Sequence, residues 1–250
     1  MQKKAQVTIF IIIGIIIVSA IIFLFTFIDV EKINSQFYSS NIEPFVVNCL
    51  ESTTESGIFF IGLQGGYFEV DNPKLEVAPF DIPLYFVNGT YMQSPTLEDV
   101  ESELSNYVET KIFDCLNNFS MFDNLKIEYE KRDINVEISI RDKKVIADLF
   151  LPVIINKKNS SIIHNEFYVE IKSNFRKRFQ AVEEYVEKQK LEPNKVMVYD
   201  LYEIANKTNL KVDLHISPGN NVVFKFIDDE THALFSNYTF AFAIKYKGEK

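Results

Sequence analysis

Several residue types are scarce or absent in this chain of 250 residues, and each shortage removes a class of function. There is no tryptophan, and there are only two cysteines, three histidines, eight glycines and eight prolines. So few cysteines and histidines leave none of them at zinc-ligand spacing. The sequence also lacks a Gly-x-Ser-x-Gly elbow, a phosphate loop, a dinucleotide fingerprint and a His-Glu-x-x-His motif. We therefore expect no metal, no cofactor and no enzymatic activity.

Positive charge is also in short supply. The chain has 26 Lys and Arg against 35 Asp and Glu, a net charge of −9. Lys3 and Lys4 are the only charged residues before position 29, so residues 29–250 alone carry −11. An acidic surface repels the phosphates of nucleic acids and of anionic membranes. We therefore exclude DNA and RNA as partners.

A long apolar run occupies the N-terminus. Val7 to Ile28 contains no charged residue over 22 positions, about 33 Å as a helix, which is enough to cross the hydrocarbon core of a bilayer. Lys3 and Lys4 precede it, and positive residues favour the cytoplasmic side. A cleaved secretory signal is disfavoured, because the run is long and no small-x-small site follows it. The sequence predicts a transmembrane helix that contacts lipid through residues 7–28 and leaves residues 29–250 outside the cell.

The junction before the apolar run resembles a known type of signal. Lys4-Ala5-Gln6-Val7, followed by Thr8-Ile-Phe10, is similar to the class III, prepilin-type signal of archaeal pilins and surface proteins. The resemblance implies cleavage between Ala5 and Gln6, which leaves the helix on the mature protein. Phe10 stands where many pilins carry the glutamate that seats each subunit in a filament. The segments 62–67 and 240–246 also resemble uncharacterised single-span proteins of small-genome archaea.

Two kinds of covalent modification are expected on the predicted exterior. Cys49 and Cys115 lie on two expected helices, and a disulfide between them is favoured over two buried free thiols. Asn-x-Ser/Thr sequons for glycosylation occur five times. Asn159, in a Lys-Lys-Asn-Ser-Ser loop, is the best candidate, whereas Asn118 could lie buried beside its helix; the alternative is that most of these asparagines are unmodified. The five are Asn88, Asn118, Asn159, Asn206 and Asn237.

The first part of the exterior is predicted to be helical. Residues 29–43 form a polar stalk, and a helix starts near Pro44 and ends at Gly65-Gly66. One face of this helix carries Phe45, Cys49, either Ser52 or Thr53, Ser56 and Phe60. The stretch 67–94 contains three prolines and is expected to be loop and short strand. Thr96 and Asp99 form a capping box before a long helix. Its apolar stripe is Leu97, Val100, Leu104, Val108, Ile112, Cys115 and Phe119.

The second part alternates apolar and polar residues, which is typical of strands. Three segments between 125 and 151 predict an antiparallel meander, with a fourth strand at 162–171. Helices are expected at 174–191 and 200–207, and strands at 210–216, 222–227 and 238–246. The fold is therefore predicted to be α+β, with amphipathic helices packed on antiparallel sheet. The predicted regions are 1–28 (cytoplasmic tip and transmembrane helix), 29–43 (stalk), 44–120 (helical subregion) and 121–250 (mixed subregion).

A catalytic or metal site could be drawn only from a few polar residues. Asp213 and His215 alternate with apolar residues on one strand, and Asp228-Asp-Glu230 precedes His232. We interpret the first pair as a solvated strand face and the acidic run as a turn. His164 is the remaining histidine, and Arg176-Lys-Arg178 is interpreted as a solvated helix face.

The sequence as a whole favours a membrane-anchored cell-surface protein of structural or interaction type. Its partner would be an envelope protein or a second copy of itself. One alternative is a pilin-like filament subunit processed before Gln6, and another is an extracellular hydrolase.

Overall fold

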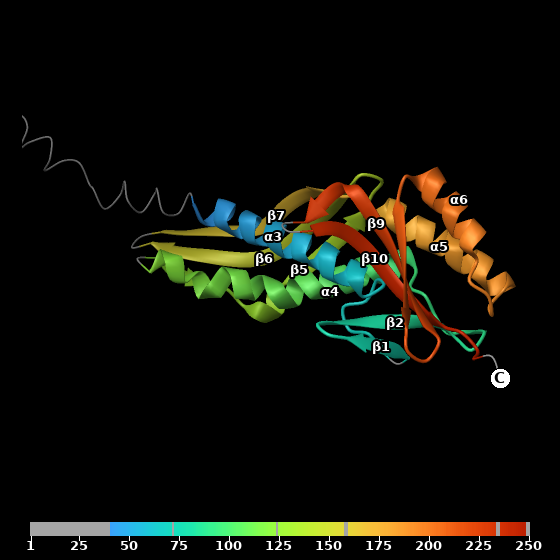
Figure 1. The fold of residues 1–250 in the computed structure, drawn as a ribbon. Helices are drawn as coiled ribbons and strands as arrows, with labels where there is room; N and C mark the ends of the chain where they lie inside the picture. The colour runs from blue at the N-terminus through green and yellow to red at the C-terminus, as the bar shows by residue number, and fades with distance from the viewer. Residues whose placement is uncertain (1–40, 72, 124, 158–159, 234–235, 249–250) are drawn as a thin grey trace, which may run out of the picture. The chain divides into compact units, whose positions relative to one another are not determined.

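The computed structural model describes residues 41–71, 73–123, 125–157, 160–233 and 236–248. The predicted membrane span 7–28, its processing site and nearly all of the stalk lie outside these residues. Within the described part no helix is long and apolar enough to cross a membrane. Residues 43–250 form one compact unit. Its helices and strands (Figure 1) are α3 (Ile42–Leu63), β1 (Lys74–Val77), β2 (Phe80–Val87), β3 (Thr90–Tyr91), α4 (Leu97–Leu116), β4 (Lys126–Glu128), β5 (Asn135–Ile140), β6 (Lys144–Lys157), β7 (Ser160–Lys172), α5 (Phe175–Leu191), α6 (Val198–Thr208), β8 (Lys211–Ser217), β9 (Asn221–Ala233) and β10 (Ser236–Lys245).

The fold is α+β, as predicted, with two sheets. The strands predicted between 125 and 171 are confirmed as a four-stranded antiparallel sheet, but the predicted meander is wrong at its start: β4 pairs with β6 instead of β5, so β4 and β5 share one edge of β6, and β7 pairs with the other. Its inward residues on β6 are the apolar alternates, Val145, Ala147, Leu149, Leu151, Val153 and Ile155, all buried. Helix α4 packs along β5.

The other sheet is mixed rather than purely antiparallel. Its strands run in the order β1-β2-β10-β9-β8, with β3 beside β2, and β10 pairs with β2 in parallel. The prediction of loop and short strand for 67–94 is confirmed by β1, β2 and β3, but β2 is longer than expected, with eight residues, of which five in succession, 82–86, are buried. Continuous burial is typical of a strand that is covered on both faces. The sequence of such a strand does not alternate between apolar and polar residues, so periodicity does not reveal it. Because β2 and β10 are partners, the predicted subregions 44–120 and 121–250 share one sheet.

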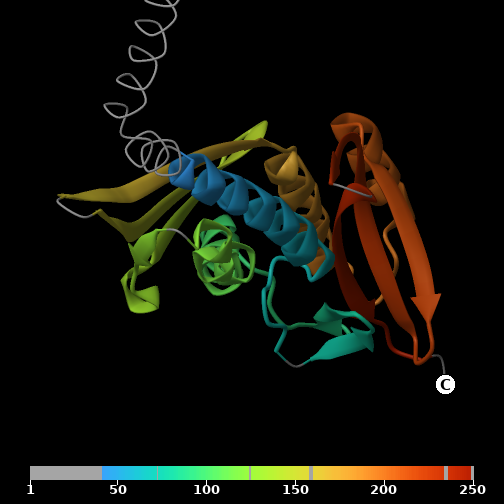
Figure 2. The same ribbon diagram turned by 90° about the vertical axis from the view of Figure 1, so that its left-hand side faces the viewer.

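Helix α3 is buried on more than one side. Its buried residues include Ile42, Val46, Leu50 and Ile58, whereas Ser56, placed on the apolar face by the sequence pattern, is exposed. The predicted face is therefore rotated by about one residue. A Cβ added at Gly57 would meet side chains of α4, and one at Gly62 would meet the backbone of β10. Helix α3 thus fills the space between α4 and β10, and Figure 2 shows α4 beside it.

The close approach of α3 to β10 predicts a destabilising glycine substitution. In Gly62→Ala the new Cβ would lie inside contact distance of the Thr239 carbonyl oxygen, which is backbone and cannot rotate away. We expect a loss of about 1–2 kcal/mol in the free energy of unfolding, because overpacking outweighs the better helix propensity of alanine. Urea unfolding measures it. Ser56→Ala, on the exposed side of the same helix, should change stability by less than about 0.5 kcal/mol; an equal or larger loss there would contradict this account.

Helix α4 begins as the sequence predicts. Thr96 is the N-cap, its hydroxyl accepts from the Asp99 amide, and the Asp99 carboxylate accepts from the Thr96 amide, which completes the capping box. The amide and the hydroxyl of Thr96, which both contact the Asp99 carboxylate at 2.8 Å, hold the pKa of Asp99 below its usual value. The predicted stripe is confirmed at Val100, Leu104, Val108 and Ile112. Cys115 is exposed, and Leu116 is buried in its place. Phe119, the last member of the predicted stripe, is buried as expected but lies beyond the end of α4, in the 3₁₀ segment Asn117–Phe122.

Candidate functional site

The two cysteines form a disulfide that joins α3 to α4. Cys49 is buried and Cys115 is exposed, their Cα atoms are 5.6 Å apart, and they are separated by 66 positions in sequence. The pairing that the sequence favoured is therefore present. It clamps two helices whose facing side chains already pack, at the end of α4 that leads into the 3₁₀ segment Asn117–Phe122.

The sequons lie in different local structures. Asn88 is exposed in the turn between β2 and β3, and Asn206 is exposed on α6. Asn118 is exposed in a left-handed conformation, and its Oδ1 accepts from the Tyr129 hydroxyl at 2.7 Å, so it does not lie buried beside α4. Asn237 is half-buried on β10 and donates to Asp229. Asn159 lies outside the described residues.

The residues from which a hydrolytic site could be drawn are not brought together. Asp213 and His215 are exposed on β8, opposite Lys225 and Val223 of β9. Their apolar neighbours Leu214 and Ile216 are also exposed, because β8 is the edge of its sheet. His164 lies on the other sheet, where its Nδ1 is 3.4 Å from a carboxylate oxygen of Glu43. Among the described residues no group of three or more His, Cys, Asp or Glu could hold a metal ion.

A buried charge cluster lies where the start of α5 meets β9, and the sequence reasoning missed it. Arg178, interpreted as part of a solvated helix face, is fully buried, and Asp228, interpreted as part of a turn, is fully buried in β9. The helical spacing contained the signal. Position 178 falls between Phe175 and Phe179 on the apolar face of α5, so a charged residue there must be buried and paired.

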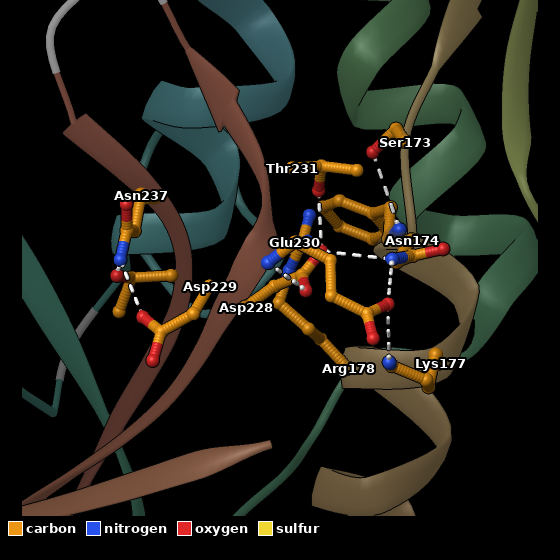
Figure 3. Close-up of polar contacts among 11 residues, drawn as sticks. Ser173, Asn174, Lys177, Arg178, Asp228, Asp229, Glu230, Thr231 and Asn237 are labelled. Carbon is orange, nitrogen blue, oxygen red and sulfur yellow. Dashed lines mark hydrogen bonds and ion pairs between the residues drawn. The ribbon is translucent and has the colours of Figure 1, made fainter. Parts of the chain in front are cut away.

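Hydrogen bonds converge on Asp228 from several elements (Figure 3). One oxygen of the Asp228 carboxylate accepts three hydrogen bonds: from Arg178 Nη1 at 3.3 Å, from the side-chain amide of Asn174 at 3.1 Å, and from the Thr231 hydroxyl. The Glu230 backbone N–H donates to the other oxygen at 3.1 Å. Asn174 immediately precedes α5, so the cluster ties the start of that helix to the end of β9.

The Arg178 guanidinium also packs against two aromatic rings. The Arg178 guanidinium carbon lies 5.5 Å from the Phe175 ring centroid and 5.1 Å from that of Tyr238. Its Nε and Nη2 atoms have no hydrogen-bond partner among the described residues. Cation–π attraction therefore supplements the single ion pair that neutralises this buried charge.

The pKa values of the pair follow from this geometry. Burial acts to raise the pKa of Asp228, but hydrogen bonds from Thr231, the Glu230 amide and Asn174, with the charge of Arg178, outweigh it and hold this pKa below 3.8. Burial lowers the pKa of Arg178 to about 10, opposed by the charge of Asp228. Both groups are ionised at neutral pH. A carboxylate that accepts this many bonds is a weak base, so the cluster positions α5 and β9 and is poorly suited to proton transfer.

Glu230 extends the cluster to the surface. Its carboxylate lies 3.5 Å from Lys177 Nζ and accepts from the amide of Asn209 at 3.1 Å. These contacts connect α5, α6 and β9.

No family model, curated protein or solved structure matches the chain. Function is therefore inferred from the residues and their arrangement.

Proposed function

We propose that this chain is a membrane-anchored cell-surface protein with a structural or interaction role. The apolar segment 7–28 would hold it in the bilayer with the N-terminus in the cytoplasm. The compact unit 43–250 would then lie outside the cell and present its surface to a partner. The resemblance of residues 4–10 to a prepilin-type signal supports the same placement.

The disulfide between Cys49 and Cys115 is the observation that carries the external location. Disulfides persist in oxidising surroundings and are rare where cellular reductants keep thiols reduced. Cys115 is exposed, so soluble reductants have access to the bridge. A bridge at this position, only a short distance in sequence after the apolar segment, is expected of an external domain.

Exposed apolar side chains support the interaction role. On β7 Ile163 and Tyr168 are 59% and 49% exposed, and α6 presents Tyr199 and Tyr202 at 71% and 66%. Large apolar side chains that cluster on an exposed surface are typical of surfaces that contact a partner, and β7 and α6 each present such a pair. Tyrosine is also enriched at interfaces, because it offers an apolar ring and a polar hydroxyl.

The mature N-terminal residue tests the anchoring directly. We expect mass spectrometry of the protein from native membranes to find either Met1 or Gln2, or Gln6 if a prepilin-type peptidase acts between Ala5 and Gln6. Each of these retains the apolar helix. A start beyond Ile28 would remove the anchor and overturn the proposal.

A mature protein that starts at Gln6 would favour the hypothesis that the chain is a pilin-like filament subunit. Phe10 then occupies the fifth mature position, where a glutamate is used by many pilins. Negative-stain microscopy of sheared surface fibres, with fibres absent from a strain that lacks the chain, would identify a filament. Membranes that carry the Gln6 form without fibres would favour a tether.

A further inference from the structure

A hollow lined mainly by cations lies between the β5–β6 turn and the start of α5. Its volume is about 660 Å³, and it is lined by Arg141, Asp142, Lys143, Lys144 and Arg176. Four of these five side chains are cationic in a chain whose net charge is −9. Arg176 is more than 30 positions from the turn in sequence, so the pattern of charges along the chain does not reveal the cluster.

Backbone hydrogen bonds fix the turn against the helix. The Ser173 amide, two residues before α5, donates to the Lys143 carbonyl at 3.0 Å, and the Arg141 amide donates to the Lys144 carbonyl at 2.8 Å. Arg176 Nη1 donates to the Ile140 carbonyl at 3.3 Å. The cations are thus presented by a braced turn and by the first turn of a helix, whose N-terminus also favours anions.

Several of these cations are not neutralised. Arg141 and Lys143 have no ion pair among the described residues, and both are exposed. Lys144 pairs with Glu170 at 2.7 Å, and Arg176 Nε lies 3.6 Å from Asp142. Four cations against these two carboxylates leave two positive charges. Including Lys172, which lies directly opposite Lys144 on β7, and Glu101, whose carboxylate accepts from the Ile140 amide, leaves the same excess.

We propose that this basic hollow binds a phosphate group, either as a free anion or as the terminal monoester of a larger molecule, such as a lipid whose headgroup is an unsubstituted phosphate. Two uncompensated positive charges match the dianion of a phosphate monoester. Arg141 supplies a planar donor fork, which matches phosphate oxygens, and Lys143 supplies a point charge. Arg176, whose Nη1 donates to the Ile140 carbonyl, contributes positive charge at the edge of the hollow. The acidic remainder of the chain is screened over about 8 Å at physiological ionic strength, so the local excess governs binding.

The size of the excess also limits the ligand. A polyanion such as DNA or RNA extends beyond the hollow and meets the acidic surface, where it gains no further contacts and is repelled. The expected ligand therefore presents one phosphate group.

Calorimetric titration of the detergent-solubilised full chain tests the proposal. Inorganic phosphate, glycerol 3-phosphate and acetate are compared at constant ionic strength. We expect saturable binding of at least one phosphate compound and none of acetate. Glycerol 3-phosphate binding the more tightly would indicate a monoester such as a lipid headgroup, and inorganic phosphate binding the more tightly would indicate a free anion. Absence of saturable phosphate binding, or equal binding of acetate, would overturn the proposal.

Two matched charge reversals locate the site. Lys143→Glu should weaken phosphate binding by at least ~10-fold, since it removes one charge-assisted contact and adds a repulsive charge. Lys211→Glu makes the same change at an exposed lysine on β8 and should leave the affinity within about twofold. Both positions are exposed, so both variants should fold, which circular dichroism verifies. Equal losses in the two variants would show a non-specific charge effect and contradict the assignment.

Discussion

Asp228→Ala is expected to lower the free energy of unfolding by about 3–5 kcal/mol, a larger loss than Gly62→Ala should cause. The substitution leaves the fully buried Arg178 without a counter-ion and removes the acceptor for Asn174 and Thr231. Denaturant unfolding followed by circular dichroism measures the effect. Asp229→Ala is the matched control, because Asp229 is the next residue and is exposed; it should cost less than about 1 kcal/mol.

The double variant Arg178→Met/Asp228→Ala separates an unpaired charge from lost packing. Removing both charges should recover at least about 1 kcal/mol relative to Asp228→Ala alone, since contacting residues couple. Simple additivity of the two single losses would show that the ion pair does not stabilise the start of α5.

The same carboxylate predicts a pH dependence. The pKa of Asp228 is depressed on folding, so its contribution is fully present above the unfolded value of about 3.8 and is lost as the pH falls through the lower native value. The stability difference between the wild type and Asp228→Ala should therefore be constant between pH 5 and 7 and shrink below about pH 4. A difference that stayed constant down to pH 2 would contradict the assigned direction.

Removing the disulfide should be about as costly. Cys49→Ala/Cys115→Ala opens a loop of 66 positions, and the chain-entropy model gives a loss of about 4 kcal/mol. For a domain of this size we expect Tm to fall by roughly 8–16 °C. Calorimetry of the wild type with and without reductant provides the comparison: reductant should lower the Tm of the wild type and leave that of the double variant unchanged. If the Tm of the double variant were less than about 2 °C below that of the oxidised wild type, α3 and α4 would be held together by packing alone.

The period of the sequence predicted most of the fold, because most elements have one exposed face. The capping box at Thr96, the stripe from Val100 to Ile112 and the four strands β4–β7 all follow from local patterns, although the pairing of β4 with β6 does not. Two other features did not. Strand β2 is buried over residues 82–86 without alternation, and its parallel pairing with β10 joins residues about 160 positions apart. Such a pairing is specified by three-dimensional packing, which no local window of sequence contains.

The polar clusters were harder to predict for a related reason. Arg178 was assigned to solvent because its neighbours Arg176 and Lys177 are basic, although its position on the helix coincides with the apolar face. Its partner Asp228 is 50 positions away, and the two meet only when α5 packs on β9. The basic hollow likewise combines the 141–144 turn with Arg176. The helical spacing places residue 178 on the apolar face of α5, but no sequence pattern indicates that Arg178 pairs with Asp228 or that Arg176 lies beside the 141–144 turn.

The central claim, that residues 29–250 lie outside the cell, is tested most directly by labelling intact cells with a membrane-impermeant amine reagent. Lys143, in the β5–β6 turn, and Lys211, on β8 of the other sheet, are both exposed, and both serve as reporters. We predict that mass spectrometry will find both lysines modified to the same extent in intact and in lysed cells. Modification only after lysis would place the compact unit in the cytoplasm and contradict the account.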